Sequence, residues 1–141
     1  MLKRINMSLY ILNDKNERMI VNLDENQMIV GDYKIRGYAQ YLEGNATHIL
    51  GDISNIWGIL SQDIDMWGFP TPSLQGDVSK IKGNITGVYG YISSYLIGDF
   101  SKIKGNITGV CGDVDKAIAE YLQKNNLTEL EDKIDVSLLI G

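Results

Sequence analysis

A seven-residue pattern of apolar and polar positions recurs eleven times between Ile35 and Val114. Each repeat reads apolar–x–Gly–x–apolar and is followed by two residues, which in the clearest cases are Ser-Asn, Ser-Lys or Thr-Gly. Apolar residues and glycine hold the first, third and fifth positions, while most second and fourth positions hold charged, amide or aromatic residues. This alternation has the period of a β-strand, so we predict that each repeat is one short strand with its odd positions directed inward.

The glycine at the third position has a steric explanation in this interpretation. A large inward side chain in the middle of a short strand would collide with those of the other sides, and glycine in a strand often marks such a close approach. The residues between repeats are typical of turns. A helix is disfavoured because each glycine in its interior would cost about 1 kcal/mol relative to alanine.

A fixed short period is typical of solenoids, and the predicted fold is therefore an all-β parallel β-solenoid. The two most similar segments, Gly76–Val88 and Gly98–Val110, are offset by three sevens plus one residue. We therefore predict a three-sided β-helix of about four coils, wound right-handed as parallel crossovers usually are. A four-sided coil is the alternative. In the three-sided register, one face would carry Gly37, Gly58, Gly83 and Gly105, the second Gly44, Gly68, Gly90 and Gly112, and the third Gly51, Gly76 and Gly98.

Both ends of the chain lack the repeat and are predicted to cap the solenoid as parts of one folded unit. Residues 1–34 would form an N-terminal β-strand cap, residues 35–114 the solenoid, and residues 115–141 a helical cap and tail. Open coil ends expose unpaired backbone groups, which is the reason for expecting caps.

Particular elements are expected within the caps. A hairpin is predicted from Met19–Leu23 and Met28–Tyr33 around a turn, with an earlier strand near Ile5–Leu12. At the other end, Lys116–Lys124 has the apolar spacing of a short helix, and Thr128–Glu131 has capping-box spacing for another helical turn. The apolar segment Ile134–Ile140 is expected to pack back onto the core.

Composition restricts the classes of partner. The chain has 141 residues, a net charge of −5 and a pI near 4.7. This acidic balance argues against direct binding of nucleic acid or of an anionic membrane. The sequence contains no apolar run of membrane-spanning length and no signal-peptide pattern. A single cysteine cannot form an internal disulfide and fits a reducing compartment, so a cytoplasmic location is expected.

The sequence offers no catalytic set, and we predict that the protein is not an enzyme and binds no cofactor or metal. His48 and Cys111 are the only residues of their kinds. In the three-sided register, at about 4.8 Å per coil, they would lie roughly 14 Å apart, which is too far for a nucleophile and its base. A zinc site of histidine and cysteine is excluded because too few ligands exist.

The candidate binding residues lie at outward positions of the repeat. Trp67, Phe69, Tyr89 and Tyr91 are predicted to form an aromatic face on two neighbouring coils, with Trp57 on the adjacent face. Such a patch would either be covered by the chain ends or serve as a protein interface, where tryptophan and tyrosine are typical anchors.

An acidic column is predicted on the third face, where Asp52, Asp77 and Asp99 would stack about 4.8 Å apart. These carboxylates either accept hydrogen bonds at the turns, near Ser54, Ser79 and Ser101, or attract a cation or a basic partner.

The run of Gly-Asp/Asn-Ile/Val-Ser/Thr units, followed by Gly112–Asp115 and a tail containing Leu127–Glu129 and Ile134–Leu138, resembles small repeat proteins encoded by phages and prophages. The architecture is also similar to that of pentapeptide-repeat solenoids, some of which act as DNA mimics. The resemblance implies a non-catalytic inhibitor of a host protein, such as an anti-CRISPR or other anti-defence protein, acting in the host cytoplasm. That host partner could itself be a nucleic-acid-binding or defence protein. The alternatives are a self-assembling homo-oligomer, in which the aromatic face joins the copies, and a small-molecule sponge.

Overall fold

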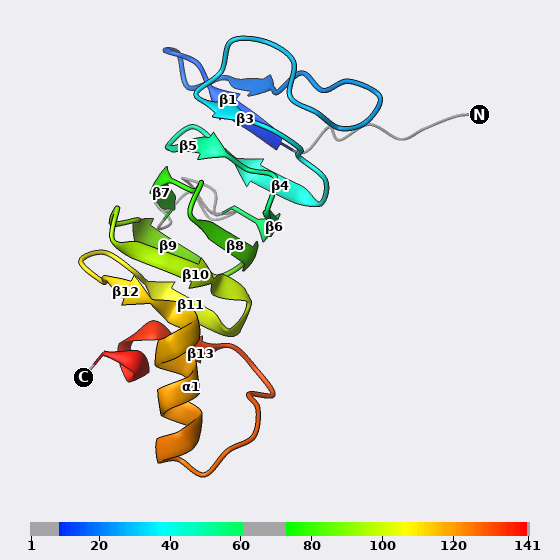
Figure 1. The fold of residues 1–141 in the computed structure, drawn as a ribbon. Coiled ribbons are helices and arrows are strands. Elements are labelled where there is room, and N and C mark those ends of the chain that lie inside the picture. The colour runs from blue at the N-terminus through cyan, green and yellow to red at the C-terminus, as the bar shows by residue number, and fades with distance from the viewer. Residues whose placement is uncertain (1–8, 61–72, 141) are drawn as a thin grey trace.

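The structure is a computed structural model that describes residues 9–60 and 73–140. The described chain is mostly β, with two largely parallel sheets and one short α-helix, which is consistent with the predicted solenoid-like class (Figure 1). The strands are β1 (Leu9–Leu12), β2 (Arg18–Ile20), β3 (Ile35–Arg36), β4 (Leu42–Asn45), β5 (Ile49–Asp52), β6 (Ile56–Ile59), β7 (Leu74–Asp77), β8 (Ile81–Asn84), β9 (Val88–Tyr91), β10 (Leu96–Asp99), β11 (Ile103–Asn106), β12 (Gly112–Asp113) and β13 (Ile134–Asp135). The helices are the 3-10 turns η1 (Phe100–Lys102) and η2 (Val136–Leu139) and the α-helix α1 (Val114–Lys124).

Successive repeats alternate between two sheets. The first sheet has the order β12-β10-β8-β6-β4-β1-β2, and the second has the order β13-β11-β9-β7-β5-β3. All neighbouring strands in these sheets are parallel except β1 and β2, which are antiparallel. Each described strand of the repeat region is therefore hydrogen-bonded to the described strand two further along the chain. This partner is two repeats away except in the pairs β5–β7 and β6–β8, which are three repeats apart because the repeat Met66–Pro70 lies between β6 and β7 in the sequence.

The three-sided prediction is wrong, and so is the four-sided alternative. Ile35 pairs with Gly51 and Leu42 pairs with Gly58, so that the first position of one repeat lies beside the third position of the repeat two further on. The similar segments Gly76–Val88 and Gly98–Val110 begin in β7 and β10, which belong to different sheets. The two segments are alike because every repeat needs the same pattern of strand and turn residues. Their corresponding residues do not stack on each other.

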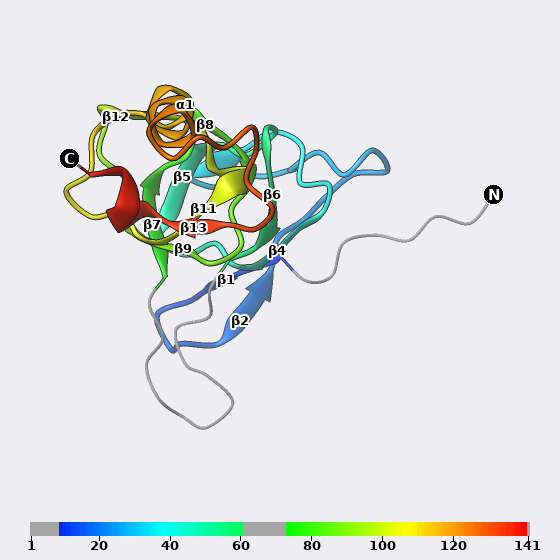
Figure 2. The same cartoon turned by 90° about the horizontal axis from the view of Figure 1, so that it is seen from below.

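The inward alternation is confirmed at the first and fifth positions. Ile49 and Ile53, the first and fifth residues of one repeat, are 1% and 0% exposed. The corresponding residues of the other described repeats join them in one hydrophobic cluster, which the two sheets share. Figure 2, seen from below the molecule, shows α1 and β12 on one side of this stack and β1 and β2 on the other.

Polar side chains at the fourth position close the turns. The Oδ1 atom of Asp52 accepts a hydrogen bond from the amide of Ser54 at 2.8 Å, and Oδ1 of Asn84 accepts one from the amide of Thr86 at 3.0 Å. This is the Asx-turn geometry for which aspartate and asparagine are favoured in turns. The same contact recurs at the other aspartate and asparagine positions, Asn45, Asp77, Asp99, Asn106, Asp113 and Asp135.

The serine or threonine two residues after the aspartate or asparagine links its repeat to the preceding strand of the same sheet through its hydroxyl group. Ser101 Oγ accepts a hydrogen bond from the Asn84 amide at 3.0 Å, and Thr86 Oγ1 accepts one from the Ile59 amide at 2.9 Å. These bonds satisfy backbone donors at strand ends, where the ladder of a sheet stops. The Asx turn and this hydroxyl form a polar ladder that runs along the edges of both sheets, and we use that name for it below.

The polar ladder also explains the glycines, and the explanation differs from the predicted one. Gly83 has φ +94°, and a Cβ atom added to it would overlap Oδ1 of Asp99 and Oγ of Ser101 in the neighbouring strand. Glycine is therefore required by its positive φ and by the polar ladder. Collision among inward side chains, which we had expected, is not the cause at Gly83. At Gly44 an inward residue does contribute, because an added Cβ atom would overlap the carbonyl oxygen of Leu60 and lie 3.1 Å from its Cβ atom.

The N-terminal cap differs in detail from the prediction. The regular hairpin is formed by β1 and β2, and β1 continues the first sheet beside β4. The predicted hairpin of Met19–Leu23 and Met28–Tyr33 is reduced to a single antiparallel bridge between Leu23 and Ile29.

The C-terminal cap begins where the repeat pattern changes. Asp113 accepts hydrogen bonds from the amides of Asp115 and Lys116 and is the N-cap of α1, so that its Asx turn also starts the predicted helix. Asp115 replaces the usual hydroxyl and accepts a hydrogen bond from the Asp99 amide at 3.2 Å. The helical turn predicted at Thr128–Glu131 is not present, and a 3-10 turn forms at η2 instead.

The tail after α1 packs back as expected. β13 pairs with β11, and Val136 is buried in the core. The ammonium group of Lys133 donates hydrogen bonds to the carbonyl oxygens of Asn84 and Thr86, at 2.6 and 2.7 Å. Burial lowers the pKa of Lys133, and the charge of Asp99 partly opposes that effect. This side chain ties the tail to a corner between the two sheets.

Candidate functional site

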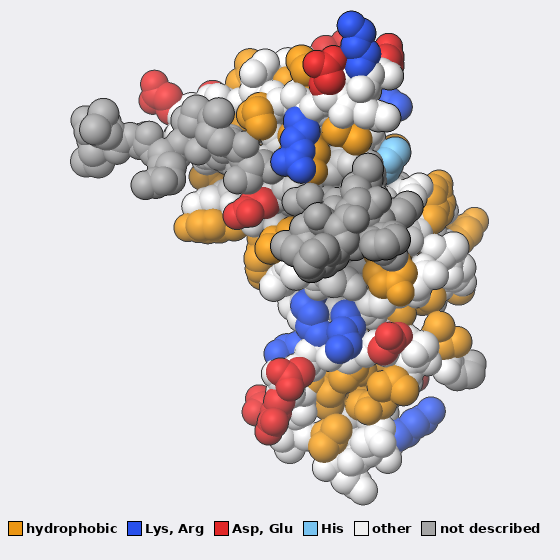
Figure 3. All heavy atoms as spheres, turned by 180° about the vertical axis from the view of Figure 1, so that it is seen from behind, with side chains coloured by type: hydrophobic (Ala, Val, Ile, Leu, Met, Phe, Trp, Pro, Cys, Tyr) orange, Lys and Arg blue, Asp and Glu red, His pale blue; other side chains and the backbone are white. Residues whose placement is uncertain are grey.

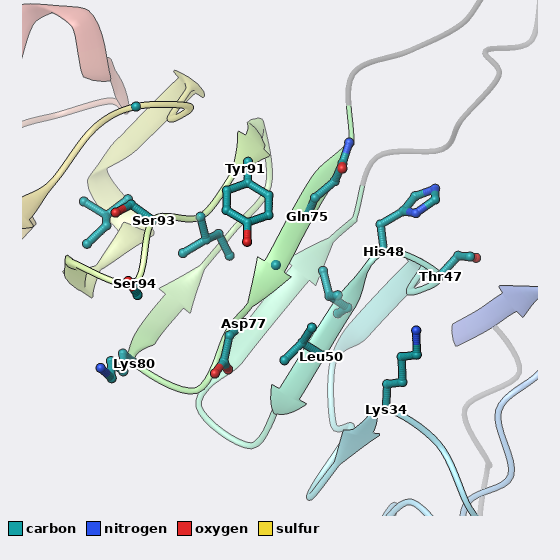
Figure 4. A pocket seen from close by; sticks show the side chains of 15 residues that line it. Lys34, Thr47, His48, Leu50, Gln75, Asp77, Lys80, Tyr91, Ser93 and Ser94 are labelled. Carbon is teal, nitrogen blue, oxygen red and sulfur yellow. The ribbon is translucent and has the colours of Figure 1, made fainter.

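A groove crosses the outer face of the second sheet. It has a volume of about 690 Å³ and extends over β5, β7 and β9. Figure 4 shows Tyr91 projecting from β9, Leu50 and Asp77 lying on β5 and β7, and Lys34 and Lys80 at its two ends. The register explains this arrangement, because Gln75 pairs with Tyr91 and Leu50 pairs with Asp77 across neighbouring strands.

Tyr91 departs from the repeat in a way that the fold does not require. It occupies the fourth position, where the neighbouring strands of the second sheet have Asp77 and Asn106. Its amide donates to Thr108 Oγ1 at 3.0 Å, so the bond between strands persists without a polar side chain at this position. The ring is 60% exposed. Its apolar surface therefore remains available for binding.

The charges of the groove are mixed. Lys34 and Lys80 bring two positive charges, and Asp77 brings one negative charge. Hydrogen bonds from the Ser79 side chain and amide lower the pKa of Asp77, which keeps its carboxylate ionised and occupied by its own turn. Figure 3 shows that acidic, basic and hydrophobic side chains are interspersed on the face that carries His48.

The predicted acidic column is divided between the two sheets. Asp52 and Asp77 lie on the neighbouring strands β5 and β7 of the second sheet, whereas Asp99 lies on β10 of the first. Hydrogen bonds from the Ser54 side chain and amide lower the pKa of Asp52, as the Ser79 bonds do for Asp77. Each of the three carboxylates accepts a hydrogen bond from the amide of the serine two residues later. Of the two explanations offered from the sequence, this is hydrogen bonding at the turns and not attraction of a cation or a basic partner.

The predicted aromatic residues are not gathered on one face either. Tyr89 and Tyr91 lie on β9, and Tyr89 is partly buried. Trp57 is 46% exposed but lies on β6 of the first sheet. Trp67 and Phe69 fall outside the residues that the structure describes.

Sequence reasoning missed the other groove residues, namely Leu50, Gln75, Lys34 and Lys80. A signal was present at Leu50 and Gln75, because both hold second positions. They lie near Tyr91 because β7 pairs with β9, two repeats further on, and the three-sided register did not place these two repeats on one face.

The single histidine and the single cysteine lie in different places. His48 lines the groove on the second sheet, while Cys111 lines a smaller cavity beside β12. Within residues 9–60 and 73–140, no group of three or more His, Cys, Asp or Glu side chains could hold a metal ion. Over the same ranges, no helix is both long and apolar enough to cross a membrane.

Comparisons with known proteins give no family. No protein-family model, no curated protein and no solved structure matches the chain. The functional reading therefore depends on the groove and on the resemblance of the repeat.

Proposed function

We propose that the chain is a non-catalytic, solenoid-type binding protein that holds a protein partner on the outer face of its second sheet. The observation that carries this proposal is Tyr91, a largely exposed aromatic residue at a position where the polar ladder uses aspartate or asparagine. Exposed tyrosine at the centre of a groove is typical of the residues that dominate binding energy at protein interfaces.

The groove indicates the chemistry of the partner segment. Tyr91 and Leu50 offer apolar surface at its centre, and Lys34 and Lys80 lie at its ends. An apolar segment flanked by acidic residues would complement both features, because charges at the rim of an interface direct association and apolar anchors provide affinity. The one carboxylate that lines the groove is less suited to binding a basic partner, since Asp77 already accepts a hydrogen bond within its turn.

The resemblance to small phage and prophage repeat proteins supports a host protein as the partner and an inhibitory, anti-defence role. In this proposal the chain acts by occupying a surface of the host protein and performs no reaction. Its only histidine and only cysteine line separate cavities, which gives no support to a nucleophile–base pair.

The test compares two substitutions that the repeat itself suggests. Tyr91→Asn introduces the residue present at the same position in Asn84 and Asn106, so the fold should be retained. Trp57→Lys introduces the residue found at the second position of β8 and alters the opposite sheet. The chain is used as bait in its native background, the captured protein is identified, and its dissociation constant is measured for each purified variant.

Loss of a central tyrosine anchor costs about 2 kcal/mol or more, which corresponds to roughly thirtyfold weaker binding. We expect this loss for Tyr91→Asn and a change of less than about twofold for Trp57→Lys. Thermal unfolding confirms that both variants are folded. Unchanged binding by Tyr91→Asn, or loss confined to Trp57→Lys, would show that the second sheet does not carry the interface.

A further inference from the structure

The first sheet ends at the C-terminal side with an open position. In the preceding strand of that sheet, a Cβ atom added to Gly98 would meet Val114 and Asp115 at 3.2 and 3.3 Å. At Gly112 in β12, the corresponding atom would meet no heavy atom of the described residues within 4 Å, although φ is again positive at +115°. The place that a further repeat would occupy beside β12 is therefore vacant, and we call it the open slot.

The open slot has the character of a binding site for a strand. A cavity of about 310 Å³ lies there, between β12, the start of α1 and η2. Its walls include the apolar side chains of Val110, Ala117, Leu139 and Ile140. Ile140 is 60% exposed and the adjoining Leu138 is 58% exposed, so the rim is apolar as well. Exposed apolar patches next to an unpaired strand edge are typical of surfaces that bind another chain.

We propose that the open slot binds residues 1–8 of a second copy of this chain, as an added strand beside β12. Ile5 and Met7 alternate with Asn6 and Ser8, which is the apolar–polar period of a strand. A segment with this pattern can place two apolar side chains between β12 and η2 while its polar side chains face solvent. Main-chain hydrogen bonds to the edge of a sheet would supply affinity, as in other cases of strand addition.

Charge favours this occupant over pairing of two C-terminal ends. Lys3 and Arg4 make the N-terminal segment basic. Asp113 lines the open slot, and Asp115 and Asp135 are the sequence neighbours of two other lining residues, Val114 and Val136. Two such ends placed face to face would bring carboxylates together, whereas a basic segment in the slot brings opposite charges together.

The segment cannot come from the same copy. β1 and β12 are separated by five strand steps in the first sheet, which is about 24 Å at about 4.8 Å per step. Only Ser8 lies between Met7 and the start of β1, and one extended residue spans about 3.4 Å. Figure 1 shows β1 near one end of the stack and β12 near the other. The contact is therefore between copies, head to tail, and it produces a series of oligomers or a ring.

Cys111 gives a direct test, since it is the only cysteine and is exposed at the open slot. Within the first sheet, the second position of a repeat pairs with the fourth position of the repeat in the following strand, as Lys82 of β8 does with Asp99 of β10. We apply the same register to the added strand beside β12. With Ile5 beside Val110, Asn6 lies beside Cys111. Neighbouring strands are about 4.8 Å apart, which is within the Cα separation that a disulfide spans.

The chain carrying Asn6→Cys is oxidised and separated without reductant. We expect a series of disulfide-linked oligomers of increasing mass, and this series should disappear when Cys111→Ser is added. Lys15→Cys, on the exposed turn between β1 and β2, is the control and should give no such series of oligomers. If Asn6→Cys forms no more disulfide-linked oligomer than Lys15→Cys, the proposal is refuted. Efficient Cys111–Cys111 dimers in the unsubstituted chain would refute it too, in favour of paired C-terminal ends.

A second measurement does not depend on cysteine. The mass of the reduced chain is followed against concentration by light scattering, and we expect association. The double change Lys3→Glu, Arg4→Glu and the single change Ile140→Glu should each weaken this association at least tenfold. Leu127→Glu, exposed but not at the open slot, should leave it unchanged. A monomer at every concentration, or association unaffected by these changes, would overturn the proposal. Of the substituted residues that the structure describes, none lines the groove on the second sheet, and Tyr91 is unchanged in every variant, so this test and that of the proposed function can fail separately.

Discussion

Replacing Gly83 by alanine tests the polar ladder most directly, because Gly112 provides a matched control. Both residues hold the third position of a repeat in the first sheet, with φ +94° and +115°. A Cβ atom at Gly83 would overlap Oδ1 of Asp99 and Oγ of Ser101, while a Cβ atom at Gly112 meets none of the described atoms within 4 Å. The two substitutions therefore share the backbone strain and differ in the disruption of the ladder.

The magnitudes follow from these two contributions. A non-glycine residue in this backbone region costs about 1–3 kcal/mol, and this cost applies to both variants. At Gly83, Asp99 and Ser101 must also move, which weakens the bond from the Ser101 amide to Asp99 (2.8 Å) and the bond from the Asn84 amide to Ser101 (3.0 Å). Each hydrogen bond contributes about 0.5–1.5 kcal/mol. Gly83→Ala should therefore be about 1–3 kcal/mol less stable than Gly112→Ala.

The free energy of unfolding is measured by urea titration of the unsubstituted chain and of both variants, with tryptophan fluorescence as the signal. Lys82→Ala, at the adjacent outward position, should change it by less than about 0.5 kcal/mol. Equal destabilisation by Gly83→Ala and Gly112→Ala would refute the polar ladder as the reason for the glycines. Equal effects of Gly83→Ala and Lys82→Ala would refute both the backbone strain and the polar ladder as causes of destabilisation at Gly83.

Two further predictions concern the ionised groups of the ladder and of the tail. The lowered pKa values of Asp52 and Asp77 mean that their contribution to stability is complete above the unfolded value, about 3.9, and is lost as the pH falls through the lower folded value. The double change Asp52→Asn, Asp77→Asn should therefore keep stability at pH 7 and reduce its loss near pH 3, as followed by urea unfolding. An identical acid loss in both proteins would contradict this. Lys133→Ala removes the donor to three carbonyl oxygens, so it should cost about 1–3 kcal/mol and speed proteolysis of residues 125–133. The exposed Lys116→Ala is the control, and equal proteolysis of the two variants would contradict the role of Lys133.

The strands and their inward positions could be predicted from the sequence because a period of two is a local property. Ile49 and Ile53 are buried for the reason that the alternation gives. The helix at α1 could be predicted too, from apolar spacing along one face. The number of sides of the coil could not be predicted from the sequence, because it depends on which strands are hydrogen-bonded to one another. Nothing within one repeat distinguishes a partner two repeats away from a partner three repeats away.

Only some residues of the candidate site, Tyr91 and Asp77 among them, were predicted from the sequence, and their grouping was not. Tyr91 is an outward aromatic in the sequence and in the structure, while Trp57 lies on the other sheet. The role of glycine was missed for a related reason. The atoms that exclude a Cβ at Gly83 belong to Asp99 and Ser101, which reach it only when the strands are stacked in the correct register.

The polar ladder also explains how a regular fold can carry individual functional residues. Three fourth positions among the described repeats lack an aspartate or asparagine, at Tyr38, Ile59 and Tyr91. At each of them the amide still donates to a hydroxyl of the neighbouring strand, and that strand has an intact Asx turn. No two of these departures are adjacent in the same sheet. A departure is thus tolerated where the next repeat keeps the complete motif, so that an exposed apolar side chain can be placed at one chosen point without breaking the ladder. A surface that varies under this rule is suited to recognition, and this is the physical reason for placing the function of the chain at Tyr91.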